Sequence, residues 1–364
     1  MKKTFELDFH GKKIVVENGE LAKQADGAVL VRYNDTVVLT ASVVSKTANL
    51  LSDFFPLTVN YQEKLYSVGK IPGGFIKREG RPSEAATLAA RMIDRPMRPL
   101  FPEGFKNEVQ VISTVLSVDQ DCSPELTAML ASSLAVSISK IPFNGPIAGV
   151  KVGRVDGEFI VNPTPEELEK SDLDLTVAGT KDAINMVEAG AKQVSEDVML
   201  DALMFGHAAV KELIEFQEKI IEEIGSPKME YETLTPEDEL VKRIRELITD
   251  KMDKALRIKE KLEKYAAIDA IKEEMIELFT KENEDKLKEQ ELKELLVKVQ
   301  MVVSEVEYEL FRSIVVKEHI RSDGRQMDEI RPLSTDIDLL PRTHGSALFT
   351  RGETQALSIT TLGA

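Results

Sequence analysis

The sequence predicts an α+β protein, in which sheets and helices pack in layers. Two observations predict this class. Alternating apolar runs separated by turn residues fill most of the first half of the chain, and helical patterns occur between them. A stretch dominated by Lys and Glu, with helical periodicity, then precedes a return of strand patterns near the end of the sequence.

The first predicted strands include a hairpin. Residues 28–32 and 36–41 are apolar runs on either side of Tyr33-Asn34-Asp35, which is a short polar turn. Residues 13–17 and 55–61 have strand-like patterns of their own and predict two further strands.

A helix is predicted to begin near Ser83. Pro82 and Ser83 are typical of a helix start, and Glu84 in the first turn favours the helix dipole. Pro96 and Pro99 predict its end. The remaining elements of this region are a strand at 109–118, a helix rich in small residues at 124–139, a hairpin at 147–161 around Asp156-Gly157, a strand at 172–178, and a helix at 196–223 capped by Ser195.

The composition changes from Thr235 to Phe311. Lys and Glu dominate there, and neither Gly nor Pro occurs after Pro236. Apolar residues at 240, 244, 247 and 248 follow the period of an amphipathic helix. We therefore expect an all-helical segment with a solvated, mixed-charge face, acting as a spacer or packing module.

The sequence then repeats itself. GAVL at 27–30 is echoed by GSAL at 345–348, and DTVVL at 35–39 by ETQAL at 353–357, both at an offset of 318 residues. The repeat predicts two copies of one domain, separated by the helical segment. Because a full copy needs about 200 residues, the second copy is expected to be truncated.

Charge and composition narrow the class of protein. The net charge is −16, which by itself argues against a nucleic-acid partner. Residues 70–98, however, hold seven Lys or Arg against three Asp or Glu, so one basic region stands out. The sequence contains neither an 18-residue apolar run nor a signal peptide, and Cys122 is its only cysteine. A single cysteine excludes an internal disulfide and a multi-cysteine zinc site, and a cytoplasmic location is expected.

Several long motifs resemble the bacterial polynucleotide phosphorylase (polyribonucleotide nucleotidyltransferase) family. The first core carries GGFIKREGRPSE at 73–84 and RMIDRPMRPLFP at 91–102. RSDGR at 321–325, EIRP at 329–332 and THGSALFTRGETQ at 343–355 resemble the opening of the family's second core. The resemblance covers essentially the whole chain in the family's order.

This resemblance implies a ribonuclease PH-like domain of β-α-β layers at 1–228, an all-helical domain at 229–311 and the start of a second, truncated ribonuclease PH-like domain at 312–364. It further implies a phosphate-dependent 3′-to-5′ exoribonuclease that releases nucleoside diphosphates reversibly and takes part in mRNA degradation. Inorganic phosphate is the expected co-substrate, Mg²⁺ the expected metal, and single-stranded RNA and a homotrimeric ring the expected partners. Further RNA-degradation partners are possible by the same resemblance, and no membrane association is expected.

The expected RNA-binding residues lie in the loop around 73–81. Phe75 offers a surface on which bases can stack, and Lys77, Arg78 and Arg81 offer contacts to the RNA backbone. Many family members carry a second aromatic residue where this chain has Ile76. The alternative is a Gly-rich surface loop whose Phe75 packs into the core.

Three arginines have helical spacing. Arg91, Arg95 and Arg98 stand at i, i+4 and i+7, so they share one face if the helix persists. By resemblance they face phosphate and the RNA 3′ end. The alternative is that carboxylates such as Asp94 and Glu84 neutralise them.

The family's catalytic carboxylates are the main feature that the first-core motif of this sequence does not match. In the family's active core, two aspartates and a lysine lie around a motif ending in Val-Ala-Gly. The corresponding first-core text is DLDLTVAG at 172–179, where Asp174 matches one aspartate, but Leu168 and Thr176 stand at the other two positions. We therefore expect a catalytically silent first core without a metal site. The active copy is expected beyond Ala364, and His344 and Arg351 are expected to approach phosphate or RNA from the second core.

Three other readings remain open at this point. The chain could be a non-catalytic RNA-binding or trimer-assembly fragment of the same enzyme. It could be a stand-alone ribonuclease PH-type exonuclease acting on transfer RNA ends, against which the helical segment and the second hairpin argue. It could be a metal-dependent hydrolytic nuclease, although the sequence lacks the clustered acidic ligands that such a site needs.

Overall fold

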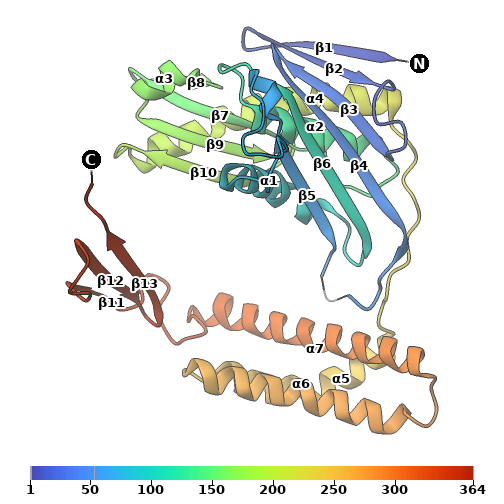
Figure 1. Ribbon diagram of the computed structural model, residues 1–364. Helices are drawn as coiled ribbons and strands as arrows, with labels where there is room; N and C mark the ends of the chain where they lie inside the picture. Colours follow the sequence, from blue (N-terminus) through green and yellow to red (C-terminus); the bar gives the residue numbers. More distant parts are fainter. Residues whose placement is uncertain (1, 53, 364) are drawn as a thin grey trace. The chain divides into compact units, whose positions relative to one another are not determined.

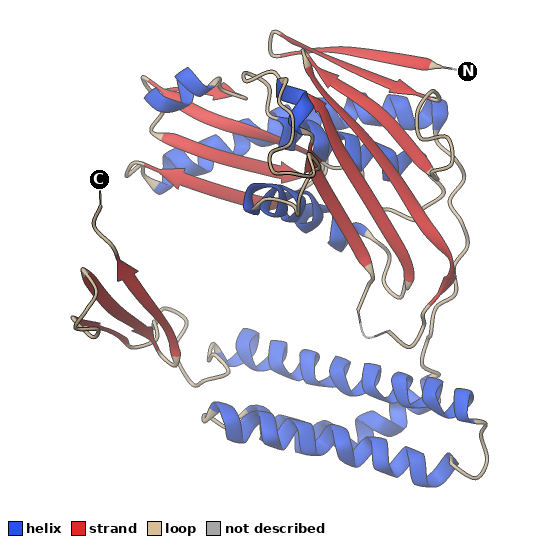
Figure 2. Cartoon of the chain, viewed as in Figure 1, coloured by secondary structure: helices blue, strands red, loops and turns tan. Residues whose placement is uncertain are grey.

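The computed structural model describes residues 2–52 and 54–363, and the chain divides into two compact units at 1–233 and 234–364. Each unit contains helices and strands, which confirms the α+β class (Figures 1 and 2). No helix among the described residues is long and apolar enough to cross a bilayer. The predicted domain boundaries at 228 and 311 stay predictions.

The first unit contains two sheets. The larger has six strands in the order β1-β2-β3-β4-β6-β5, antiparallel except for the parallel pair β5 and β6. The smaller has four antiparallel strands in the order β10-β9-β7-β8. The strands are β1 (Lys3–Phe9), β2 (Lys12–Asn18), β3 (Gly27–Tyr33), β4 (Thr36–Ala48), β5 (Leu57–Glu63), β6 (Asn107–Ser117), β7 (Ala148–Val155), β8 (Glu158–Val161), β9 (Leu173–Gly179) and β10 (Ile184–Ala191).

Two long helices, α2 (Pro124–Ile138) and α4 (Glu196–Ile224), lie behind the sheets in the view of Figure 1 and share one hydrophobic core with them. The other helical elements are η1 (Leu65–Val68), α1 (Glu84–Met97), η2 (Arg98–Leu100) and α3 (Pro165–Lys170). Ser83 and Ser195 cap α1 and α4 as predicted, because each hydroxyl accepts a hydrogen bond from a first-turn amide.

The small residues of α2 allow it to approach the six-stranded sheet closely. A Cβ atom on Gly27 would lie only 2.0 Å from the carbonyl oxygen of Ala135, so this strand position requires glycine. Ser42 Oγ donates to the same carbonyl at 2.9 Å. Polar atoms buried between sheet and helix are thus paired with one another, as burial in an apolar core requires.

The second unit begins with three helices that form a core of their own. They are α5 (Asp238–Leu256), α6 (Lys261–Asn283) and α7 (Glu289–Glu318). Exposed ion pairs join them, among them Arg243 with Glu282 and Arg245 with Glu309, each at 2.6 Å. The Lys- and Glu-rich composition therefore forms inter-helix pairs on a solvated face, while Ile and Val fill the interior.

Three antiparallel strands complete the second unit and confirm the sequence repeat. They are β11 (Leu333–Ile337), β12 (Gly345–Arg351) and β13 (Thr354–Thr360). Gly345 pairs with Thr360 as Gly27 pairs with Ser42, so both hairpins have the same register. The first turn residue has a positive φ in each copy, +48° at Asn34 and +60° at Gly352.

Some elements differ from the sequence prediction. Helix α1 does not stop before Pro96 but runs through Met97, and the Arg98 amide donates to the Asp94 carbonyl. A proline removes only one hydrogen bond near a helix end, so the last turn survives it. Helix α7 runs past Phe311 to Glu318. The strands β1 and β10 and the short helix α3 were not predicted.

Candidate nucleic-acid interface

The segment between η1 and α1 forms a loop that is anchored at both ends. At its start, the Lys70 amide donates to the Leu65 carbonyl at 3.0 Å. Toward its end, Glu79 Oε1 accepts a hydrogen bond from the Leu65 amide, also at 3.0 Å, and Ser83 begins α1. The intervening residues therefore project from a fixed base, and the sequence alone did not reveal the role of Glu79 in that base.

The tip of this loop presents Phe75 to solvent. Its exposed fraction is 102%, so the alternative in which Phe75 packs into the core is wrong. Ile76 beside it is 72% exposed. An aromatic ring held entirely in solvent gains nothing from the core, and such rings are a common feature of surfaces that stack unpaired bases.

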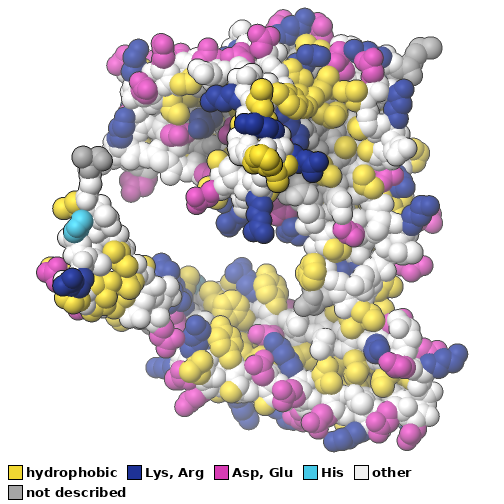
Figure 3. Space-filling view, in the orientation of Figure 1, with side chains coloured by type: hydrophobic (Ala, Val, Ile, Leu, Met, Phe, Trp, Pro, Cys, Tyr) yellow, Lys and Arg dark blue, Asp and Glu magenta, His cyan; other side chains and the backbone are white. Residues whose placement is uncertain are grey.

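Cations follow the exposed ring closely in the sequence. Lys77 and Arg78 follow Phe75 directly, and Arg81 lies four residues after Lys77. All three are exposed, and within residues 2–52 and 54–363 none has an ion-pair partner. Lys77 has a φ of +55°, a conformation that L residues adopt infrequently. Figure 3 shows basic and hydrophobic side chains interleaved over the η1–α1 region.

The apolar exposure extends beyond the predicted residues. Tyr66, Val68 and Ile71 are 57%, 53% and 79% exposed. Sequence reasoning missed them because exposure of an isolated apolar residue has no sequence signature. Together with Phe75 they give the loop region a larger apolar surface than the single aromatic residue suggested.

The three arginines of the α1 region have different partners. Arg91 is exposed, and no carboxylate in the described part of the chain pairs with it. Arg95 Nη2 lies 2.9 Å from Glu188 Oε1, in a pair that is about half exposed on both sides. Arg98 donates to both carboxylate oxygens of Asp94, at 3.0 and 2.7 Å.

Arg98 also has a structural role. Its Nη1 and Nη2 atoms donate to the carbonyls of Phe55 and Leu57, each at 3.1 Å. These contacts fix the end of α1 against the start of β5, and together with the Asp94 pair they use four of its five guanidinium N–H groups. The three arginines therefore do not form one free cationic face, and Arg91 and Arg95 remain the members available to an anion.

The first core does not assemble a carboxylate pair at its Val-Ala-Gly motif. Asp174 Oδ1 lies 3.0 Å from Lys151 Nζ, and Asp172 Oδ2 lies 2.7 Å from Arg154 Nη1. Both carboxylates thus have basic partners, which supports the structural role predicted for Asp174. Thr176 in the neighbouring position is buried.

The predicted second-core residues lie in the other unit. His344 Nδ1 accepts a hydrogen bond from the Leu362 amide at 2.8 Å, so it acts as a local acceptor beside the β12–β13 hairpin. Arg351 ends β12 and is exposed. Their approach to phosphate or RNA stays a prediction.

Comparisons with known proteins decide the family. Models of domain 1 and domain 2 of the 3′ exoribonuclease family match residues 10–142 and 145–209, and together they cover more than half of the chain. The RNA binding domain of polyribonucleotide nucleotidyltransferase matches residues 239–326. The chain belongs to the polyribonucleotide nucleotidyltransferase family.

Individual relatives agree with the family models. Polyribonucleotide nucleotidyltransferases of Bacillus cytotoxicus and Halalkalibacterium halodurans are 57% and 59% identical over 364 and 360 residues. These alignments include 100% and 99% of this chain but 50% of each relative, so the chain spans about half the length of the curated relatives it matches. Among solved structures, rice (Oryza sativa) Rrp46 aligns with a TM-score of 0.46 and 14% identity over 61% of this chain and 94% of that protein.

Proposed function

We propose that this chain binds single-stranded RNA at the loop from Lys70 to Arg81, as part of a phosphate-dependent 3′-to-5′ exoribonuclease. The exposed Phe75 ring, flanked by cations that pair with no carboxylate in the described part of the chain, is the observation that carries the proposal. Aromatic stacking tolerates every base, and lysine or arginine contacts to phosphate are independent of sequence. The surface is therefore suited to a strand that passes through processively rather than to a specific site.

The anchored base of the loop supports the same function. Glu79 holds the loop to Leu65, so the ring and the cations are presented without the entropy loss of ordering a free loop. The rest of the chain is acidic, with a net charge of −16 overall. An isolated basic surface on an acidic protein concentrates a polyanion at that one place.

For the phosphorolytic step, we propose that Arg91 and Arg95 hold inorganic phosphate or the 3′-terminal phosphodiester. No carboxylate in residues 2–52 and 54–363 pairs with Arg91, and the exposed pair of Arg95 with Glu188 is weak enough to exchange for a phosphate oxygen. Arg98 positions α1 through Asp94 and the β5 carbonyls rather than contacting substrate. Phosphate attack on the terminal phosphodiester would then release a nucleoside diphosphate.

The first core does not fit the Mg²⁺ that the family resemblance implies. Its single candidate, Asp174, is paired with Lys151, and Leu168 and Thr176 provide no carboxylate beside it. Hard cations such as Mg²⁺ need several oxygen ligands, so we assign no catalytic step to this core. We propose that Mg²⁺ binds instead in the second core that the sequence repeat predicts.

The wider biological setting is a proposal that rests on the family resemblance. We propose a homotrimeric ring, a cytoplasmic location, and a role in mRNA degradation that includes partners of an RNA-degradation complex. The alternative function is a non-catalytic RNA-binding or trimer-assembly fragment of the same enzyme, and the pairing of Asp174 with Lys151 favours it for the chain taken alone.

A binding measurement tests the RNA proposal. Fluorescence anisotropy of a labelled 20-nucleotide oligo(A), titrated with the 364-residue chain, should show saturable binding that weakens as salt increases. A duplex of the same length should bind more weakly, because its bases are not free to stack on Phe75. Equal affinity for single strand and duplex at every salt concentration would exclude the stacking mechanism.

A further inference from the structure

The second unit contains a cavity of about 950 Å³ that the RNA-binding loop does not use. It lies where α6 and α7 meet the segment that leads into β11 and the β12–β13 turn. Its size suits a small ligand, because such sites are typically about 300–1,000 Å³. Its lining combines aromatic rings, aliphatic side chains and several cations.

A buried lysine faces this cavity. Lys264 on α6 is only 7% exposed, and its ammonium donates a hydrogen bond to the Ser322 carbonyl. That partner is neutral. The neighbouring carboxylate, Asp323, is already paired with Arg325 at 2.9 Å and with Arg331 at 3.6 Å.

The buried charge of Lys264 therefore has no ion-pair partner of its own among the residues that the structure describes. Burial lowers the pKa of its ammonium, and the nearby Asp323 carboxylate opposes this shift without cancelling it, so the surroundings disfavour the charged form. A buried cation without its own counter-ion is costly, and a bound anion would offset that cost.

The remaining charges of the lining leave the cavity positive. Lys261 and Arg351 line it, and neither has a carboxylate partner within the described residues. Six Lys or Arg and four Asp or Glu line the cavity. Of the four carboxylates, Asp323 is paired as described above, and Glu353 has no ion-pair partner among the described residues. The other two are occupied. Glu307 pairs with Lys272 at 2.9 Å, and Glu260 accepts hydrogen bonds from the amides at the start of α6. A negatively charged ligand is thus favoured over a cation.

Two tyrosines give the cavity its aromatic surface. Tyr265 on α6 is 52% exposed and Tyr308 on α7 is 64% exposed, and both line the cavity. Ile268 beneath them belongs to the helical core, so the floor is apolar. Exposed rings beside an apolar floor and a set of cations suit a flat base attached to a phosphate.

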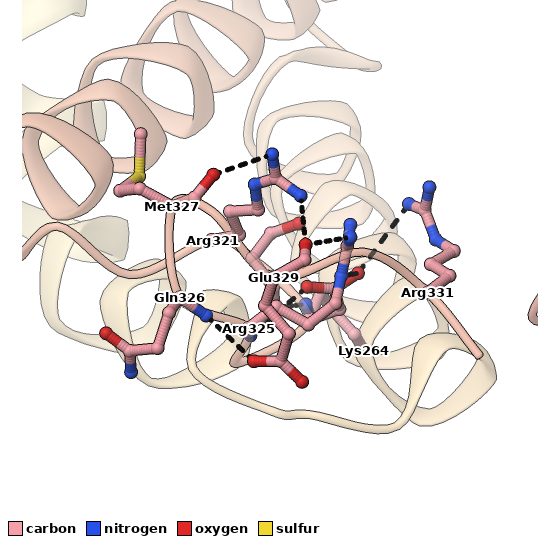
Figure 4. Close-up of polar contacts among 9 residues, drawn as sticks. Lys264, Arg321, Arg325, Gln326, Met327, Glu329 and Arg331 are labelled. Atoms are coloured by element: carbon pink, nitrogen blue, oxygen red, sulfur yellow. Dashed lines mark hydrogen bonds and ion pairs between the residues drawn. The ribbon is translucent and has the colours of Figure 1, made fainter.

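The segment opposite the helices is held by its own hydrogen bonds. Arg321 donates to the carbonyls of Glu329 and Met327 at 2.9 and 3.0 Å, and Arg325 donates to the Glu329 carbonyl at 2.9 Å (Figure 4). A wall fixed in this way lowers the entropic cost of binding a ligand against it.

We propose that this cavity binds a nucleotide, with the base against Tyr265 and Tyr308 and the phosphate at Lys264, Lys261 and Arg351. The ligand is either a free nucleoside phosphate or one nucleotide unit of single-stranded RNA. The second source rests on the proposed RNA-binding function, whereas the first does not.

Calorimetric titration of the full 364-residue chain tests the site, with ADP and inorganic phosphate as separate probes. ADP should bind, and inorganic phosphate should bind at least tenfold more weakly because it lacks a base. Lys264→Met keeps the aliphatic stem and should weaken ADP at least tenfold, the typical effect of losing a charged hydrogen bond. The matched control is Lys293→Met, which removes an exposed lysine paired with Glu289 on α7 and should leave ADP binding unchanged.

A second pair of variants does not depend on a buried residue. Tyr308→Ala should weaken ADP binding severalfold, and Tyr308→Phe should retain it because the ring remains. ADP affinity that is the same in Lys264→Met, Tyr308→Ala and the unmodified chain would overturn the free-nucleotide form of the proposal.

Oligo(A) separates the two sources. If RNA is the ligand, Tyr308→Ala should weaken oligo(A) binding and ADP should compete with it. If the ligand is a free nucleotide, ADP and oligo(A) should bind together, and Arg78→Ala in the loop should weaken only oligo(A). If neither ADP nor oligo(A) responds to the cavity variants, the site does not exist, and the loop proposal is still decided by its own variants.

Discussion

Arg98 and Asp94 form a bidentate pair one helical turn apart, with Nε–Oδ2 and Nη2–Oδ1 distances of 3.0 and 2.7 Å. The pair closes the last turn of α1, where Pro96 removes a backbone donor. The same guanidinium reaches the carbonyls of Phe55 and Leu57. An arginine that the spacing assigned to a shared anion site thus holds the helix to the sheet.

Substitutions of Arg95 and of Arg98 should therefore have different effects. In the complete enzyme, Arg95→Ala should lower the rate of phosphorolysis by roughly 10²-fold, as expected for the loss of one donor to the reacting phosphate, with little change in stability. Arg98→Ala should lower the free energy of unfolding by about 1 kcal/mol, because Asp94 and two carbonyls lose their donor. Urea unfolding and release of ADP from poly(A) measure the two effects. A stable but inactive Arg98→Ala enzyme would contradict this division of roles.

The 364-residue chain alone should lack phosphorolytic activity. Asp174 is engaged by Lys151, and the neighbouring positions carry Leu168 and Thr176, so the described residues of the first core form no metal-binding carboxylate group. Incubation with poly(A), phosphate and Mg²⁺, followed by chromatography for ADP, measures this directly. ADP release at a rate near that of a complete relative would place catalysis in the first core and refute its silence.

Lys228 should make stability depend on pH. Its ammonium donates to the carbonyls of Ser137 and Ser139 at 2.7 and 2.8 Å, at the end of α2, and burial lowers its pKa to about 8. An unfolded lysine titrates near about 10.4, so the unfolded state binds more protons between those values. Stability should therefore rise with pH across that window, relative to Lys228→Met.

Urea unfolding of both proteins from pH 7 to pH 10 measures this difference. The carbonyl acceptors favour the charged amine and oppose burial, so the rise should be smaller than burial alone would give. A difference in unfolding free energy that stays constant across the window would show that Lys228 titrates normally.

Cys122 should be inert in the folded protein. Its side chain is fully buried, and burial raises the pKa of its thiol to about 11, so little thiolate exists near neutrality. A thiol reagent such as DTNB should react only as fast as the protein unfolds, and at once in concentrated denaturant. Rapid reaction without denaturant would mean that the loop from Asp119 to Ser123 opens in the native state.

Local signals predicted much of the fold. The hairpin turn at Asn34, the caps at Ser83 and Ser195 and the helical periodicity of residues 240–248 each depend on neighbours in the sequence, and the structure confirms them. Strand β10 was not predicted, because it is an edge strand that contains Gly190 and pairs only with β9. The parallel pairing of β5 with β6 depends on distant contacts, which no local pattern encodes.

In the candidate site too, local sequence predicted some features, and others depend on tertiary packing. Asp94 was visible as a partner for Arg98 because it lies one helical turn away, whereas Glu188 reaches Arg95 from a distant strand. The anchoring of the loop by Glu79 and the burial of Lys264 likewise come from tertiary packing. Sequence patterns therefore identified the basic and aromatic region, and the structure identified which of its cations are free.

The central claim is that the loop from Lys70 to Arg81 binds RNA. Its most direct test compares two double variants that each remove two positive charges. Lys77→Ala with Arg78→Ala removes two cations beside Phe75, whereas Lys211→Ala with Lys219→Ala removes two exposed lysines on α4. The measurement is the salt dependence of oligo(A) affinity by anisotropy. The loop variant should weaken binding and flatten the slope of log K against log salt by about 1.4, or about 0.7 per phosphate contact, while the α4 variant matches the unmodified chain. Equal slopes in the two variants would contradict an RNA-binding loop.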